Sequence, residues 1–131
     1  MTMREILFRG KHKADGKWCE GNLHIDKQGV AIITPDDTPR GCFRLVAPDT
    51  VGQYTGLIDK NGTKIFEGDI VKLRLLAAKM EWKGVCEYRN GAFGLAWQYA
   101  GERYSTFVGT CNAEYEVLGN IHDNKELMEG E

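Results

Sequence analysis

The sequence predicts a mainly β protein with two lobes and little helix. Three observations lead to this prediction: short apolar or alternating runs recur along the chain, glycines and other turn residues separate most of them, and helix-forming segments are few and short. A chain of 131 residues, 42% of them apolar, can bury enough surface for one cooperative core. The formal net charge of −2 gives no long-range field that would hold a polyanion, so any nucleic-acid contact would be local.

The expected strands are short runs that mostly end at a glycine or another turn residue. They are Ile6–Phe8, Trp18–Ile25, Val30–Ile33, Gln53–Ile58, Lys64–Phe66, Ile70–Leu75, Gly84–Tyr88, Ala92–Trp97 and Tyr115–Ile121. All three prolines fall between Pro35 and Pro48, in a stretch that also contains several aspartates, which indicates a crossing between lobes. We therefore expect a small N-terminal β meander in residues 1–48 and a larger lobe in residues 49–131.

Three turns carry the most specific local signals. Asp15-Gly16 separates the first two strands of the meander, and Asp59–Gly62 begins with an aspartate suited to a type I turn and ends with a glycine suited to a left-handed position. Glu67–Asp69 leads directly into the alternating strand that starts at Ile70, an arrangement typical of small SH3-like barrels. From about Val51 onward we expect a strongly bent, barrel-like antiparallel sheet with a hairpin tip at Asn61-Gly62.

Helix is expected in at most two short segments. Leu75–Trp82 has helix-forming composition but no clear cap, so it fits a short helix or a loop that rides on the barrel. Asp123 and Glu126 have the spacing of a capping box, which predicts a short C-terminal helical turn that buries Leu127 and Met128.

Three blocks in the sequence carry a resemblance to a known family. Residues 4–10 with Gly16-Lys17-Trp18 and Glu20-Gly21, residues 51–71, and residues 116–122 are similar to the YopX family in the same order along the chain. The resemblance implies a protein encoded by a phage or prophage, with a coiled β structure and an SH3-like barrel in its C-terminal part. It implies no catalytic or binding residue.

Candidate catalytic groups do not form a recognisable pattern. The glycines of residues 52–68 lie between expected strands and lack the Lys and Ser or Thr of a phosphate loop. Glu67 and Asp69 could hold a cation or transfer protons, but we interpret Asp69 as a turn residue that accepts backbone N–H groups and Glu67 as solvated. His12, His24 and His122 have no partner at a recognisable spacing. We expect no enzyme activity and no cofactor.

The cysteines and the hydropathy of the chain bear on its compartment. Cys19, Cys42, Cys86 and Cys111 are widely separated among hydrophobic neighbours, which predicts free, mostly buried thiols and no metal site. No run is long enough to span a bilayer or to act as a signal peptide, so we expect a cytoplasmic protein in a bacterial host cell.

Two groups of residues are candidates for binding. Aromatic residues concentrate in the larger lobe, at Trp82, Tyr88, Phe93, Trp97, Tyr99, Tyr104 and Phe107. A small barrel cannot enclose them all, so Trp97, Tyr99 and Tyr104 are candidates for an outer contact surface, the alternative being edge packing. The basic N-terminal segment, with Arg9, Lys11 and Lys13, could form a rim for nucleic acid or meet the acidic end of a neighbour; its residues could equally be solvated.

Two functions from different classes fit these observations. The first is a non-enzymatic binding or assembly protein that contacts a host or phage protein or its own copies. The second is a nucleic-acid-binding accessory factor in phage replication or gene expression. Because a small β protein with little helix leaves strand edges to be covered, we expect self-association in preference to nucleic-acid binding.

Overall fold

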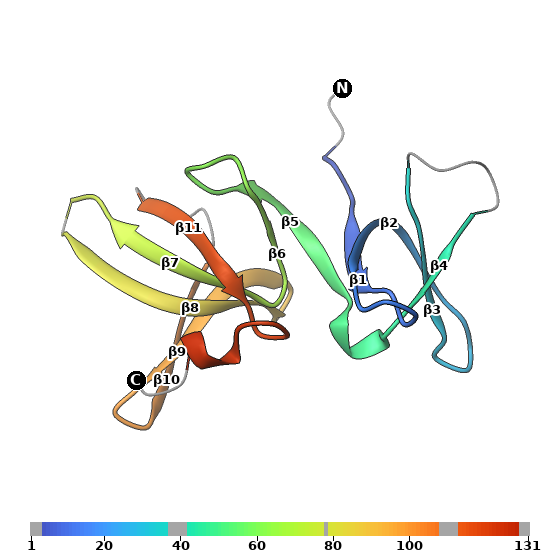
Figure 1. Cartoon of the computed structure of the whole chain (residues 1–131). Coiled ribbons are helices and arrows are strands. Elements are labelled where there is room, and N and C mark those ends of the chain that lie inside the picture. The colour runs from blue at the N-terminus through green and yellow to red at the C-terminus, as the bar shows by residue number, and fades with distance from the viewer. Residues whose placement is uncertain (1–3, 37–41, 78, 108–112, 129–131) are drawn as a thin grey trace. The chain divides into compact units, whose positions relative to one another are not determined.

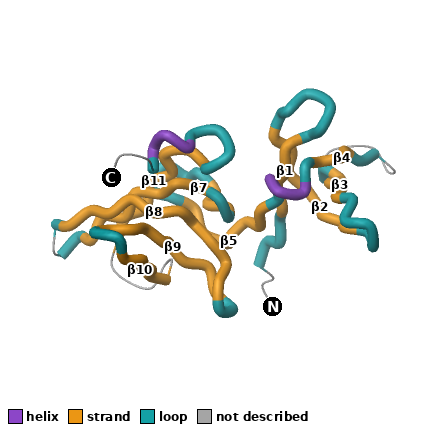
Figure 2. The backbone as a smooth tube through the Cα atoms, turned by 90° about the horizontal axis from the view of Figure 1, so that it is seen from below, coloured by secondary structure: helices purple, strands orange, loops and turns teal. Residues whose placement is uncertain are grey.

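The structure is a computed structural model that describes residues 4–36, 42–77, 79–107 and 113–128, and it confirms a mainly β protein. Figure 2 shows strand along most of the backbone and helix in two short pieces. The chain divides into two compact units, Met1–Gly56 and Leu57–Glu131. This division falls later in the chain than Pro48, near which the sequence analysis set the boundary.

The first unit contains four strands, a 3-10 turn and most of a fifth strand (Figure 1). These are β1 (Phe8–Lys11), β2 (Trp18–Ile25), β3 (Ala31–Thr34), β4 (Arg44–Val46), η1 (Pro48–Thr50) and β5 (Gly52–Ile58). The hydrogen-bonded order is β4-β3-β2-β1-β5, with antiparallel pairing throughout. The expected meander is thus β1 to β4, although the sequence analysis did not find β4.

The long strand β2 is shared between two short sheets. Its first half pairs with β1, from Lys11↔Trp18 to Phe8↔Gly21, and its second half pairs with β3. After β3 the chain returns to the end of β1. There Val46 of β4 forms a bridge with His12, and the Ala47 N–H donates to the Lys11 carbonyl at 2.9 Å. The enclosed core is small and apolar.

Two glycines of β1 and β2 allow this close packing. A Cβ added to Gly21 would lie 2.2 Å from the Thr34 carbonyl oxygen, and one added to Gly10 would lie 3.0 Å from the Val46 side chain. At the β1–β2 turn Gly16 has a φ of +70°, and the Asp15 carboxylate accepts the Lys17 N–H at 3.0 Å. The predicted hairpin is confirmed.

The second unit contains six further strands and a second 3-10 turn. These are β6 (Lys64–Phe66), β7 (Asp69–Leu75), β8 (Met80–Arg89), β9 (Ala92–Tyr99), β10 (Glu102–Phe107), β11 (Ala113–Asn120) and η2 (Lys125–Leu127). β6 follows β5 in the hydrogen-bonded order, and the other five strands form an antiparallel sheet in the order β10-β9-β8-β7-β11.

The five-stranded sheet is open in the part of the chain that the structure describes, so the expected closed barrel is not formed there. Figure 1 shows β7 with β8 as one long hairpin and β9 with β10 as a second hairpin that points away from it. β10 was not predicted from the sequence. This extra strand extends the sheet beyond β9, whereas a closed barrel would need β9 to meet β11.

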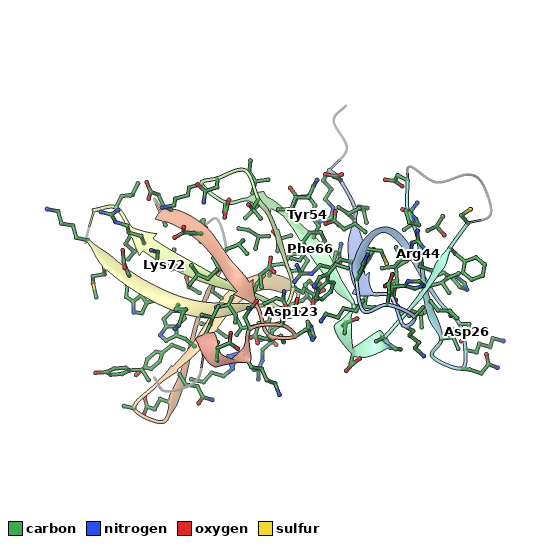
Figure 3. All side chains as sticks on the ribbon, in the orientation of Figure 1. Asp26, Arg44, Tyr54, Phe66, Lys72 and Asp123 are labelled. Carbon is green, nitrogen blue, oxygen red and sulfur yellow. The ribbon has the colours of Figure 1, made fainter. Side chains whose placement is uncertain are left out.

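One face of this sheet carries the core of the second unit. Residues opposite each other in the register share a face, and the buried face contains Val71, Leu73, Cys86 and Leu95, packed against Ile65 of β6. The opposite face is charged near β7 and β11, where the Lys72 ammonium lies 3.2 Å from a Glu116 carboxylate oxygen (Lys72 is labelled in Figure 3).

Of the two helical expectations, the helix or loop at Leu75–Trp82 is wrong, whereas the short C-terminal helical turn is confirmed as η2 but lacks the predicted capping box. Leu75–Trp82 contains the ends of β7 and β8, with Leu75 opposite Met80, because strand pairing and the packing of Trp82 on the core outweigh the helix-forming composition. At the C-terminus η2 begins after Asn124 without a side-chain cap. Asp123 instead accepts the Asn120 side-chain amide at 3.2 Å, so no capping box forms.

Candidate functional site

The hairpin between β5 and β6 is held by a buried carboxylate. Asp59 is only 6% exposed; one of its oxygens accepts the N–H groups of Asn61 at 2.8 Å and Thr63 at 2.9 Å, and the other accepts the N–H of Val117 on β11 at 2.9 Å. Burial raises the pKa of the Asp59 carboxyl, but the three backbone N–H groups outweigh it and hold the pKa below its usual value. Gly62 has a φ of +85°, which confirms the predicted tip.

The turn between β6 and β7 is a second structural joint. Asp69 is 1% exposed and accepts the Phe66 N–H at 2.8 Å, as predicted for a turn residue, while Glu67 is half-buried. Gly68 has a φ of +89°; its N–H donates to the Cys86 carbonyl at 2.8 Å, and its carbonyl accepts the Ile121 N–H at 2.9 Å. Phe66 is labelled in Figure 3.

A third joint follows β11. The register between β7 and β11 shifts between Val117 and Gly119, and the Asn120 side-chain oxygen then accepts the N–H groups of His122 and Asp123, each at 2.9 Å. A Cβ on Gly119 would lie 2.4 Å from the Asn124 side-chain oxygen. Residues of two family-like blocks, 51–71 and 116–122, therefore meet around β11 and stabilise the fold there.

Among the described residues, the histidines and cysteines do not converge on a site. In the first hairpin His12 Nδ1 lies 3.2 Å from an Asp15 carboxylate oxygen. The hydrogen bond from the Lys17 N–H lowers the pKa of the exposed Asp15 carboxyl, and His12 adds to this effect. His24 is on β2 and His122 follows β11. Within the described residues no three His, Cys, Asp or Glu side chains form a group that could hold a metal ion.

The cysteines differ in burial. Cys86 is buried, Cys19 is half-buried with its thiol 3.4 Å from the Gly10 carbonyl, and Cys42 is exposed, contrary to the expectation of mostly buried thiols. Cys111 lies outside the described residues. Burial raises the pKa of the Cys19 thiol, so this thiol is less reactive than an exposed one.

Three rings stack across neighbouring strands of the second sheet. Trp82 on β8 and Trp97 on β9 have ring centroids 5.8 Å apart at an interplanar angle of 28°, and Trp97 and Tyr104 on β10 are 6.2 Å apart at 18°. We call Trp82, Trp97 and Tyr104 the aromatic row. By register it continues the buried face of the sheet, which contains Leu95, toward the β10 edge.

The row borders a groove of about 960 Å³. Besides the aromatic row, its walls include Tyr99, which is 72% exposed, and charged residues such as Glu87 and Arg103, which form an ion pair. The predicted candidates Trp97, Tyr99 and Tyr104 thus line one groove. Trp82 was missed as a member because its segment was expected to be a helix or loop, although its even spacing from Cys86 on the buried face was a usable signal.

The basic candidates lie in the first unit and behave differently. The Arg9 guanidinium lies 4.7 Å and the Lys11 ammonium 5.5 Å from the centre of the Trp18 ring, as expected for cation–π contacts. Lys13 is exposed in the following turn, where its N–H donates to the Leu45 carbonyl at 2.8 Å. Trp18 was not predicted as the shared partner, although the hairpin register, which sets Lys11 opposite Trp18, is a signal for it.

The fold and these contacts define a two-unit antiparallel β protein with an aromatic groove, and among the described residues no helix has the length and hydropathy to cross a membrane. A sequence profile described as YopX protein matches residues 7–129. The chain belongs to the YopX family.

Solved structures share this fold. The chain is similar to protein yopX from Bacillus subtilis, with 17% identity, a TM-score of 0.62, and coverage of 97% of this chain and 100% of the other. It is also similar to protein EF1440 from Enterococcus faecalis, with 23% identity, a TM-score of 0.51 and the same coverages. No curated protein matches this chain significantly.

Proposed function

We propose that this chain is a non-enzymatic binding and assembly protein that contacts other protein molecules through the aromatic row and its groove. The observation that carries the proposal is the stack of Trp82, Trp97 and Tyr104, which leads from the core of the second unit to an edge strand. Aromatic rings are enriched at the centres of protein interfaces, where they bury large areas with little loss of side-chain entropy. The Glu87–Arg103 pair also lines the groove, but by register it lies on the opposite face of the sheet from the rings.

The proposal includes a biological setting and a fold detail. A phage or prophage origin, action in the bacterial cytoplasm and a phage or host protein as partner are supported by the family resemblance. An SH3-like arrangement of residues 49–131 stays part of the proposal, and it is supported by the turn at Glu67–Asp69 that leads directly into β7.

A capture experiment with matched variants tests the proposal. Tagged wild-type protein, Trp97→Ala and Tyr88→Ala are recovered from phage-infected bacterial cells after nuclease treatment. Tyr88 is a suitable control because it is 56% exposed and pairs with Phe93 on the same two strands, outside the row. We expect specific proteins to be retained by wild type and Tyr88→Ala and lost from folded Trp97→Ala. Equal retention by all three would refute the proposal.

The second candidate function is nucleic-acid binding by the first unit. The observation in its favour is the convergence of Arg9 and Lys11 on Trp18, with Lys13 exposed next to them in sequence. It ranks lower because the two cations already contact the indole, and the net charge of −2 adds no attraction. A gel-shift assay with mixed single-stranded DNA and RNA at physiological salt should show no complex. A shift that Lys11→Gln and Lys13→Gln abolish would reverse the ranking.

A further inference from the structure

Two edge strands of the sheets, β4 and β11, are partly covered by other segments of the chain. At β4 the Leu45 carbonyl accepts the Lys13 N–H at 2.8 Å. At β11 the Tyr115 carbonyl accepts the Lys60 N–H at 2.9 Å, and the Val117 N–H donates to Asp59 at 2.9 Å. These contacts satisfy backbone N–H and C=O groups that would otherwise be available for pairing with another strand.

β10 is different. It pairs with β9 over its whole length, from Glu102↔Tyr99 to Phe107↔Gly94, and in the described part of the chain no backbone hydrogen bond reaches its other side. The residues from Glu102 to Ser105 are exposed. The aromatic row ends on this strand at Tyr104, which is 41% exposed. An uncovered edge and a partly exposed ring therefore lie on the same strand.

The charges of β10 restrict how it can pair with an identical strand. Two copies related by a two-fold axis perpendicular to the sheet must pair antiparallel, with one residue opposite itself. A centre at Glu102 or Arg103 would place like charges directly opposite each other, which is destabilising. A centre at Tyr104 sets tyrosine against tyrosine and Arg103 against Ser105, and it brings the two aromatic rows together.

We propose that β10 pairs antiparallel with β10 of a second copy of this chain, centred on Tyr104. This inference rests on the proposed function and names the occupant of its surface. The pairing supplies partners for the outward backbone groups of β10, and it buries Tyr104 against its counterpart, so one continuous sheet carries six stacked rings. Because this interface is formed by backbone groups and rings, raising the ionic strength should change its stability little.

Charge changes at Ser105 test both the pairing and its register. Ser105→Glu places a carboxylate opposite the partner copy's guanidinium at position 103 in two symmetric pairs, whereas Ser105→Lys places an ammonium there. We expect sedimentation equilibrium of the full chain to show dimerisation about two- to thirty-fold tighter for Ser105→Glu and weaker by a similar factor for Ser105→Lys. Gln28→Glu and Gln28→Lys make the same changes in an exposed turn of the first unit and should leave association unchanged.

The outcomes separate this inference from the proposed function. Equal effects of Ser105→Glu and Ser105→Lys would overturn the Tyr104-centred register. A wild-type chain that stays monomeric at every concentration would overturn the pairing altogether. If such a monomer still captures proteins in a Trp97-dependent way, the inference fails alone; if Trp97→Ala also captures like wild type, the proposed function fails with it.

Discussion

Removing the Asp59 carboxylate should destabilise the protein more than removing an exposed turn carboxylate such as Asp26. The carboxylate holds the β5–β6 hairpin through Asn61 and Thr63 and ties it to β11 through Val117. A hydrogen bond to a charged group contributes about 1.5–3 kcal/mol. Asn61 and Thr63 are exposed, so water can satisfy their N–H groups after truncation, which limits the cost of losing these two bonds. We expect Asp59→Ala to lower the free energy of unfolding by about 3–5 kcal/mol.

Two further variants show where this energy arises. Asp59→Asn keeps one carbonyl oxygen for the turn but presents an amide NH₂ group to the Val117 N–H, so it should cost about 1.5–3 kcal/mol. Asp26 is the matched control: its carboxylate accepts the N–H groups of Gln28 and Val30, each at 2.9 Å, but it is exposed and reaches no other strand (Asp26 is labelled in Figure 3). Asp26→Ala should cost about 1 kcal/mol.

Urea-induced unfolding followed by far-UV circular dichroism measures all three variants against wild type. The predicted order of destabilisation is Asp59→Ala, then Asp59→Asn, then Asp26→Ala. If Asp59→Ala and Asp26→Ala have the same effect, the contact with β11 contributes nothing, and the account of the family-like residues as structural joints is wrong.

Three other predictions follow from the same contacts. Because the folded state lowers the pKa of Asp59, the stabilising effect of the carboxylate is complete above the unfolded pKa of about 3.9 and is lost as the pH falls below that value. In urea titrations at several pH values, Asp59→Asn should therefore lose less stability at acid pH than wild type does. Identical pH profiles of the two proteins would contradict this prediction. Gly21→Ala should lower the free energy of unfolding by about 1–3 kcal/mol in thermal unfolding, because the added methyl group would clash with the Thr34 carbonyl. Gly16→Ala is the control, since its methyl group has open space and only the positive φ is strained. Equal costs for the two variants would show that the strands move apart easily to accommodate the methyl group. Thiol titration of the unfolded, non-reduced protein should count four free cysteines, and in the native state Cys42 should react before Cys19 and Cys86. A count near zero, or zinc bound in a fixed ratio, would contradict the prediction of free thiols.

The sequence alone predicted elements whose cause is local. Trp18–Ile25 and Lys64–Phe66 were predicted with the bounds that the structure has, because alternation and flanking glycines determine them. The same holds for the tip at Gly62, where a positive φ requires glycine or a residue that tolerates it.

Elements that depend on distant partners were missed. β4 is short and β10 is polar, with Glu102 and Arg103 at its start, so neither has a run that periodicity detects; each exists because a neighbouring strand pairs with it. The bonds from Asp59 to Val117 and the stacking of Trp82 on Trp97 join residues far apart in the chain. Such contacts need the register of the sheet, which a single sequence does not give.

The central claim is that the β10 edge, next to the aromatic row, is the surface through which the protein assembles. Amide hydrogen exchange of the full chain at low and high protein concentration tests it most directly. We predict that amide groups between Glu102 and Thr106 become more protected as the concentration rises, while those of β4 and β11 exchange at constant rates. Exchange in β10 that does not depend on concentration, or protection that grows at β4 instead, would contradict the claim.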